Sequence, residues 1–196
     1  VDAKSEAGRA DWIDILSRSL PYVDFFVPSV EELCFMLDRD RYEAWNERAA
    51  GKDITEAISL EEVKPLAERA ISMGAKVVLI KCGAPGIYYR TAAREQMASV
   101  CKELGLAVDQ WAEKEGFARS FVPDQILSGT GAGDTSIAAF LVSVLEGCSL
   151  EEAVQLAVAT GACCVASYDA LSGLQPLTAL KEKIKNGWAK NEFPGW

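Results

Sequence analysis

The stretch of this 196-residue chain with the clearest chemical meaning is SGTGAGD at residues 128–134, which runs directly into the apolar segment TSIAAFLVSVL. Glycines allow positive φ angles and leave no Cβ in the way of a ligand. A helix that begins near residue 132 would present backbone N–H groups without partners inside the helix, at the positive end of its dipole. Such a terminus binds anions, and the glycines let an anion come close.

Asp134 stands beside this predicted anion site. Its carboxylate would repel a second anion unless a reaction needs both groups, and phosphoryl transfer to an alcohol is such a reaction. The carboxylate takes the hydroxyl proton while the N–H groups stabilise charge on the phosphoryl group. The alternative is a glycine-rich turn in which Asp134 only caps the helix. A Walker loop is excluded because the turn has no lysine, and the glycine spacing does not fit a dinucleotide fingerprint.

Composition limits the other functional classes. The chain is 49% hydrophobic and 25% charged, which is typical of a globular domain, and its net charge of −9 without a basic run disfavours a nucleic-acid partner. No apolar run is long enough to suggest a membrane span, and the first residues lack the features of a signal peptide. The absence of histidine excludes Ser-His and Cys-His pairs and His-based zinc sites. The six cysteines lack metal-type spacing and are expected to be buried, free thiols of a cytoplasmic protein.

The apolar periodicity predicts strands that alternate with helices, and hence an α/β fold with a mostly parallel sheet covered by helices. Ser59 with Glu62, and Ser149 with Glu152, have the spacing of capping boxes at helix starts. Residues 92–120 are interpreted as an excursion or insertion with helical character over 92–105. Helices are expected in the segments 10–24, 30–47, 59–74, 135–147, 149–167 and 178–190, and in the first of these Pro21 ends the helix. Strands are expected over 23–29, 75–83 and 86–91, and the last two pair across a turn.

Four segments carry a resemblance to a known family. GTGAGDTSIAAFL resembles the second signature of the PfkB family of sugar kinases, in the ribokinase-like superfamily, which usually reads DTxGAGD before a helix of small residues. VDFFVPSVEEL resembles the strand end with the N-x-x-E motif, VVLIKCGAPGIYY the strand and glycine turn on the nucleotide side, and SLEEAVQLAVATGA the helix that flanks the adenine. Their order and spacing agree with the family, and the resemblance covers nearly the whole chain, weakly over 92–120.

This resemblance implies a three-layer ribokinase-like fold with a mostly parallel central sheet flanked by helices. Residues 1–196 would form only its C-terminal, ATP-binding part, because the sugar-binding residues and the β-strand lid of the family's N-terminal half are not in this sequence. The implied partner is a small-molecule sugar, with no role for nucleic acid or a membrane. Family lids often pair subunits, so a homodimer would have to form through a lid absent from this chain.

The resemblance also implies roles for individual residues. Asp134 would be the general base, and Glu32 would act on Mg²⁺ through water. The backbone N–H groups of the 131–133 turn would form the anion hole, and Gly83 and Gly86 would line the ATP phosphate loop. Thr130 would lie near a monovalent-cation site. The matched residues of the anion hole are Gly131, Ala132 and Gly133, and those of the cofactor site are Lys81, Gly83, Gly86, Thr130, Val158 and Ala162.

The chain departs from the family pattern at four positions. Ser29 replaces the usual Asn of N-x-x-E, and Ser128 replaces the usual first Asp of the signature, which argues against a K⁺ site of the family type. Lys81 replaces a usual Thr and would either meet a phosphate as a point charge or face solvent. Val158 replaces a frequent Asn and favours apolar packing on the base. Since Asp134 and its glycines are intact, the resemblance implies an ATP- and Mg²⁺-dependent kinase for a sugar hydroxyl.

The alternative hypothesis is a nucleotide- or sugar-binding regulator with the kinase fold and little turnover. It is favoured by Ser29 and Ser128.

Overall fold

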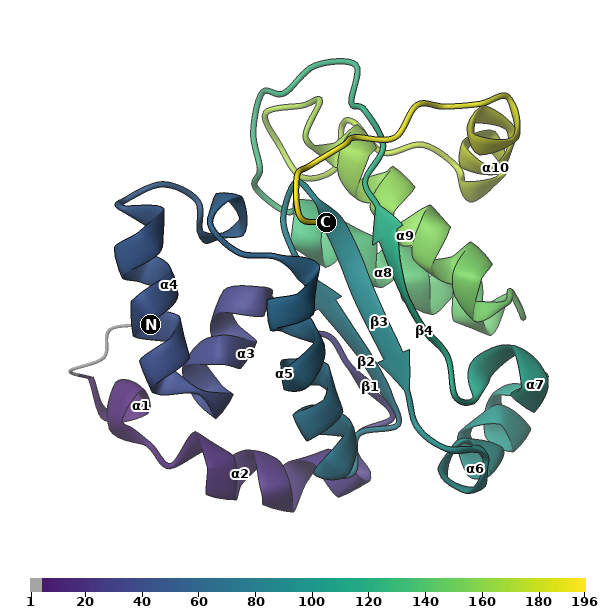
Figure 1. The fold of residues 1–196 in the computed structure, drawn as a ribbon. Coiled ribbons are helices and arrows are strands. Elements are labelled where there is room, and N and C mark those ends of the chain that lie inside the picture. The colour runs from purple at the N-terminus through teal and green to yellow at the C-terminus, as the bar shows by residue number, and fades with distance from the viewer. Residues whose placement is uncertain (1–4) are drawn as a thin grey trace.

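Four strands form one sheet between two helical layers in the computed structural model, which describes residues 5–196 (Figure 1). The strands are β1 (Phe25–Phe26), β2 (Val77–Lys81), β3 (Gly86–Thr91) and β4 (Glu115–Arg119), in the order β1-β2-β3-β4. β1 pairs with β2 in parallel, whereas β2 with β3 and β3 with β4 are antiparallel. The expected sheet flanked by helices is confirmed, but within the described residues it is mixed rather than mostly parallel. The four-residue turn between β2 and β3 explains this, because a parallel pair needs a long crossover.

The helices fall into two groups on opposite faces of the sheet (Figure 1). Alternate residues of β2 point to opposite faces, so Val78 and Ile80 pack against the group that contains α5, while Val77 and Leu79 pack against the group that contains α8 and α9. The first group has α1 (Glu6–Arg9), α2 (Trp12–Ser19), α3 (Val30–Leu37), α4 (Arg39–Ala49) and α5 (Leu60–Ser72), with 3₁₀ turns η1 (Leu20–Tyr22) and η2 (Ile54–Glu56). The second has α6 (Arg94–Leu104), α7 (Val108–Trp111), α8 (Ala132–Leu145), α9 (Leu150–Cys164) and α10 (Leu177–Lys185).

The helix expected over 30–47 is two helices that meet at Asp38. Its backbone leaves the helical region (φ −150°, ψ 81°), so it ends α3, and its carboxylate accepts a hydrogen bond from the Arg41 N–H to begin α4. An aspartate can satisfy the free N–H groups of a new helix, which favours a break at this position. The strand expected over 23–29 shortens to Phe25 and Phe26.

The segment 92–120 is part of the core rather than an excursion. It forms α6, α7 and β4, and β4 pairs with β3 along its whole length. Trp111 is fully buried, with its ring edge-to-face against Phe25 and Phe140. The sequence of β4 is polar because β4 is an edge strand with one face exposed to solvent, and for this reason the apolar pattern did not predict a strand there.

Other expectations are confirmed directly. All six cysteines are buried and free. Ser149 accepts a hydrogen bond from the Glu152 N–H at the start of α9, and Ser59 with Glu62 closes a capping box on α5. Among residues 5–196, none of the helices combines the length and apolar character that crossing a bilayer would need.

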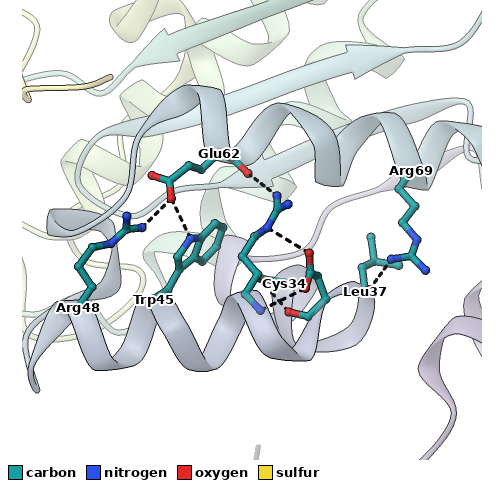
Figure 2. Close-up of polar contacts among 8 residues, drawn as sticks. Cys34, Leu37, Trp45, Arg48, Glu62 and Arg69 are labelled. Carbon is teal, nitrogen blue, oxygen red and sulfur yellow. Dashed lines mark hydrogen bonds and ion pairs between the residues drawn. The ribbon is translucent and has the colours of Figure 1, made fainter.

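Glu62 also ties α5 to α4 (Figure 2). One carboxylate oxygen accepts hydrogen bonds from the Ser59 amide (3.0 Å) and hydroxyl (3.2 Å). The other accepts from the Trp45 indole (3.1 Å) and the Arg48 guanidinium (2.6 Å). Trp45 is almost fully buried in the core between α3, α4 and α5. One carboxylate thus caps one helix and holds the buried indole of another.

We expect Glu62→Gln to lower the free energy of unfolding by about 1–3 kcal/mol, because a neutral amide replaces a carboxylate that accepts charged and cap hydrogen bonds. The matched control is Glu61→Gln in the same helical turn. Glu61 is 77% exposed and pairs only with Lys64, so its loss should cost about 0.5 kcal/mol or less. Urea unfolding measures both, and equal losses in the two variants would contradict the role given to Glu62.

The same pair of variants has a pH dependence. Burial alone would raise the pKa of Glu62, but the hydrogen bonds from Arg48, Ser59 and Trp45 outweigh it and hold the pKa below its ordinary value. A depressed folded-state pKa gives stability that is present above the unfolded value of about 4.3 and is lost as the pH falls through the folded value. The gap between wild type and Glu62→Gln should therefore be constant near neutral pH and shrink below about pH 4.

Candidate active site

A cleft of about 560 Å³ lies where β2 ends, β3 begins and α8 starts. Seven residues singled out in the sequence line it, from three separate segments: Lys81, Gly83, Gly86, Ala132, Gly133, Val158 and Ala162. One end is polar, with Asp53, Lys81 and the 82–86 turn, and the other is apolar. The apolar lining consists of Phe121, Pro123, Ile126, Val158, Ala162 and Val165.

The start of α8 forms one wall of the cleft. Gly131 is its N-cap, with φ at +79°, and the first i→i−4 hydrogen bond of the helix runs from the Thr135 N–H to the Gly131 carbonyl (2.9 Å). The N–H groups of Gly133 and Asp134 precede that bond and have no acceptor inside the helix. Because Ala132 and Gly133 line the cleft, the positive end of the helix dipole is directed to it.

The loop that follows α9 supports this turn from behind. A Cβ on Gly131 would lie 2.3 Å from the Ala170 Cβ, so the Ala170 methyl packs directly on the Gly131 backbone. The buried Cys164 thiol donates to the carbonyls of Thr130 (3.6 Å) and Ala170 (3.5 Å). The Leu127 N–H donates to the Val165 carbonyl (2.8 Å). The glycine-rich turn is thus fixed by packing rather than left as an open loop.

Lys81 brings a cation to the same wall. Lys81 is the last residue of β2, and its backbone N–H donates to the Pro28 carbonyl (2.9 Å). Its ammonium nitrogen would lie 3.4 Å from a Cβ added to Gly133. The side chain therefore lies over the first turn of α8 inside the cleft, which resolves the alternative of a lysine directed only to solvent. Among residues 5–196, no carboxylate lies within ion-pair distance of this ammonium. A cation and a helix N-terminus repel each other, and an anion between them relieves that repulsion.

Glu32 serves as a cap in this structure. Its carboxylate accepts from the Ser29 amide (2.9 Å), and the Ser29 hydroxyl accepts from the Glu32 amide (3.2 Å), which closes a capping box on α3. The hydrogen bonds from Ser29 lower the pKa of Glu32, and the charge of Lys81 lowers it further. Burial raises the pKa of the neighbouring Glu31, as do the charges of Asp53 and Glu32. The carboxylates of Glu31 and Glu32 are therefore close enough to Asp53 and Lys81, which line the cleft, for their charges to interact.

Three of the singled-out side chains lie outside the cleft lining. Asp134 is exposed on the first turn of α8, next in sequence to Gly133, which lines the cleft. Thr130 is exposed, and Glu32 lies beyond Lys81 at the start of α3. No group of three or more Asp, Glu, Cys or His side chains in residues 5–196 is arranged to hold a metal ion by itself.

The structure adds cleft residues that sequence reasoning missed. Phe121, Pro123 and Ile126 line the apolar end, and their signal was the run FVPDQIL directly before the glycine-rich turn. Asn191 and Phe193 also line the cleft. They reach it from a segment about 60 residues beyond the turn, and no local pattern in the sequence marks them.

The class of fold is established by solved structures. Ribokinase of Arabidopsis thaliana, complexed with ribose and ATP, has a TM-score of 0.61 and 22% identity, over 86% of this chain and 43% of that chain. Ribokinase of Cryptococcus neoformans var. grubii, in complex with ADP, has a TM-score of 0.58 and 16% identity, over 87% and 48%. The protein has a ribokinase-like fold, and residues 1–196 correspond to a part of it.

The family follows from the sequence itself. The model of the pfkB family carbohydrate kinases matches residues 9–176, so the chain belongs to this family. An uncharacterized sugar kinase of Archaeoglobus fulgidus is 29% identical over 119 residues, which are 61% of this chain and 39% of that protein. The chain spans less than half the length of each of these three relatives.

Two glycines of the turn allow a matched test of its packing. Gly131→Ala should lower the free energy of unfolding by about 2–4 kcal/mol, because the new Cβ meets Ala170 and the backbone has a positive φ. At Gly129, two residues earlier, an added Cβ would meet nothing within 4 Å and the backbone has no positive φ. Gly129→Ala should therefore change the free energy of unfolding by about 1 kcal/mol or less. Similar unfolding midpoints for the two variants in urea would show that the 166–174 loop does not support the turn.

Proposed function

We propose that this chain forms the ATP-binding and phosphoryl-transfer part of a carbohydrate kinase, which moves the γ-phosphate of ATP to a sugar hydroxyl. The observation that carries the proposal is the approach of the Lys81 ammonium to the N-terminal turn of α8, inside a cleft that ends in an apolar pocket. A nucleoside triphosphate has the complementary chemistry, with anionic phosphates at one end and an apolar base at the other. The A. thaliana relative was solved with ribose and ATP, which supports this choice.

In this proposal the residues of the turn divide the chemistry between them. Asp134 takes the proton from the sugar hydroxyl, whose oxygen then forms a bond to the γ-phosphorus while the bond to the β-phosphate oxygen breaks. The N–H groups of Gly131 and Gly133 stabilise the charge on the transferring group, and Lys81 adds a positive charge beside them. The N–H of Ala132 donates to the Gly129 carbonyl (3.2 Å) and would join them by giving up that bond. Asp134 is exposed, which suits a base that must contact a sugar bound largely by residues that are not in this sequence.

The remaining cleft residues would hold the nucleotide. The backbone of the 82–86 turn would meet the phosphates at Gly83 and Gly86, and Val158 and Ala162 would give the base an apolar wall without a hydrogen-bonding side chain. Glycine at 86 also serves the sheet, because a Cβ there would lie 2.1 Å from the Ala118 carbonyl oxygen of β4. Thr130 is exposed beside Ser128, and this pair offers no carboxylate for a monovalent cation.

The donor set fits Mg²⁺ only together with phosphates. Mg²⁺ prefers oxygen ligands and usually keeps several waters, so one or two carboxylates with substrate phosphates are enough. Glu32, held ionised by Ser29 and Lys81, would face such an ion through water. When bound, the ion neutralises charge on the phosphates during transfer.

Asp134→Asn should lower kcat by about 10²–10⁴-fold or more in the whole protein, because the amide cannot accept the hydroxyl proton. Its affinity for ATP should stay within about twofold. ADP release measured with a panel of sugars gives the rate, and calorimetry with ATP gives the affinity. Asp14→Asn, at an exposed site on α2, is the control and should turn over normally. An Asp134→Asn enzyme with a near wild-type rate would show that the base assignment is wrong, and a wild type that binds ATP and sugar without turnover would favour a regulator.

Lys81→Met should weaken ATP binding by about 10–100-fold, since a buried charge–phosphate contact contributes about 1.5–3 kcal/mol. Inorganic triphosphate should lose a similar factor, because the lost contact is to the phosphates. Lys64→Met, which removes an ammonium paired with Glu61 on α5, should leave both affinities unchanged. Unaltered triphosphate binding in Lys81→Met would exclude Lys81 as a phosphate contact.

A further inference from the structure

Residues 188–196 form a strap that lies outside the part of the chain matched by the family, which ends at residue 176. In Figure 1 this yellow segment leaves α10 and crosses to the ends of β2 and β3. Two of its side chains, Asn191 and Phe193, line the cleft. The strap is therefore a wall of the candidate site that family membership does not explain.

The first anchor of the strap is its pairing with residues 119–122. Lys190 forms an antiparallel bridge with Phe121, the Val122 N–H donates to the Ala189 carbonyl (2.9 Å), and the Asn191 N–H donates to the Ser120 carbonyl (2.9 Å). The Lys190 ammonium lies 3.5 Å from the centroid of the Phe121 ring and donates to the Arg119 carbonyl (2.7 Å). Burial, with the charge of Arg119, lowers the pKa of Lys190 to about 8.

This first anchor reaches the phosphate end of the cleft through one serine. The Asn191 side-chain amide donates to the Ser120 hydroxyl (2.9 Å), and that hydroxyl donates to the Ala84 carbonyl in the 82–86 turn. The Ser120 N–H also donates to the Pro85 carbonyl (3.0 Å). The strap thus holds one side of the turn that presents Gly83 to the cleft.

The second anchor is at the far end of the strap. The Trp196 indole donates to the Thr55 carbonyl (3.1 Å), its ring packs on Phe117 with centroids 5.5 Å apart, and the Leu60 N–H donates to the Gly195 carbonyl (2.9 Å). Thr55 is in turn the nearest neighbour of the space above Gly83, at 3.7 Å from an added Cβ. Thr55, to which Trp196 ties the strap, therefore lies next to the 82–86 turn at Gly83.

Phe193 lies between the two anchors, two residues after Asn191 and two before Gly195. It is half-buried, and the regular structure of the segment that carries it is limited to the bridge at Lys190. An aromatic side chain that lines the same cleft as Lys81 and Val158 is suited to pack on a nucleoside.

We propose that the 188–196 strap is a nucleotide-affinity element of this protein: Phe193 packs on the nucleoside of the bound triphosphate, and Trp196 holds the strap closed. This inference rests on the proposed function, because it assumes a nucleoside triphosphate in the cleft. It assigns two residues that contribute to binding without contacting the transferred phosphate. Binding and closure are coupled, since a nucleotide that contacts Phe193 favours the docked strap.

The test compares Phe193→Ala and Trp196→Ala with Tyr22→Ala, an exposed aromatic on η1 outside the cleft lining. Calorimetry with ATP and with inorganic triphosphate is run on the full chain. Phe193→Ala should weaken ATP binding by about tenfold, the size expected for loss of one aromatic packed on a base, and leave triphosphate binding unchanged. Trp196→Ala should weaken ATP binding by a similar factor, and Tyr22→Ala should change neither.

Hydrogen exchange gives a second readout that does not depend on affinity. The Asn191 amide reports the first anchor, because it donates to the Ser120 carbonyl, and the Leu60 amide reports the second, because it donates to the Gly195 carbonyl. ATP should slow exchange at Leu60 in the wild type, and Trp196→Ala should speed it and remove the ATP effect. Circular dichroism and the melting temperature check that each variant is folded, and the exchange pattern of β2 and β3 serves as the internal reference.

The possible failures can be told apart. If the wild type binds ATP and Phe193→Ala binds it with unchanged affinity, the strap proposal is wrong while the proposed function stands. If Phe193→Ala loses ATP and triphosphate binding equally, the residue acts on the turn and not on the nucleoside, which also overturns the proposal. If the wild type binds triphosphate but shows no preference for ATP, or binds neither, the proposed function fails and the strap proposal with it.

Discussion

The contact between α8 and α9 at Gly161 is the constraint on which the candidate site depends. A Cβ at this position would lie 2.6 Å from the Ser136 hydroxyl, which itself donates to the Ala132 carbonyl (2.7 Å). The glycine lets the two helices approach until a side chain of one touches the backbone of the other. This approach fixes the first turn of α8 against the cleft, and both Ser136 and Gly161 line it. Any larger residue at 161 would move the wall that carries the free N–H groups.

Packing therefore brings like charges together near the start of α8, where the Lys81 ammonium approaches the positive end of the helix dipole. Asp53 and Lys81 line the cleft beside the start of α8. Glu31 and Glu32 lie outside the lining, but the charge of Asp53 acts on Glu31 and that of Lys81 acts on Glu32. Each group alone has an ordinary structural explanation: Glu32 caps α3, and Gly131 is the N-cap of α8. Together they produce a positive wall with acidic groups behind it, which is suited to phosphates and a divalent cation.

Sequence reasoning succeeded where the rule is local and failed where the partner is distant. The capping box of Ser59 and Glu62, the β2–β3 hairpin and the start of α8 follow from neighbouring residues, and the structure confirms them. The break at Asp38 competes with a continuous helical periodicity, so the pattern did not separate the two helices. β4 looked irregular because an edge strand needs few apolar residues. Phe193 could not be assigned, because its place in the cleft is fixed by anchors in the segments at 119–122 and 55–60.

The second anchor of the strap has a consequence for the order of folding. The bond from Trp196 to Thr55 joins residues 141 positions apart in sequence. Contacts of such separation form late, because the entropy of closing a long loop is lost before any contact is gained. During synthesis, the sheet and the glycine-rich turn emerge from the ribosome before the strap does. The nascent chain therefore adds this wall of the cleft only after the β2–β3 hairpin and the glycine-rich turn have been made.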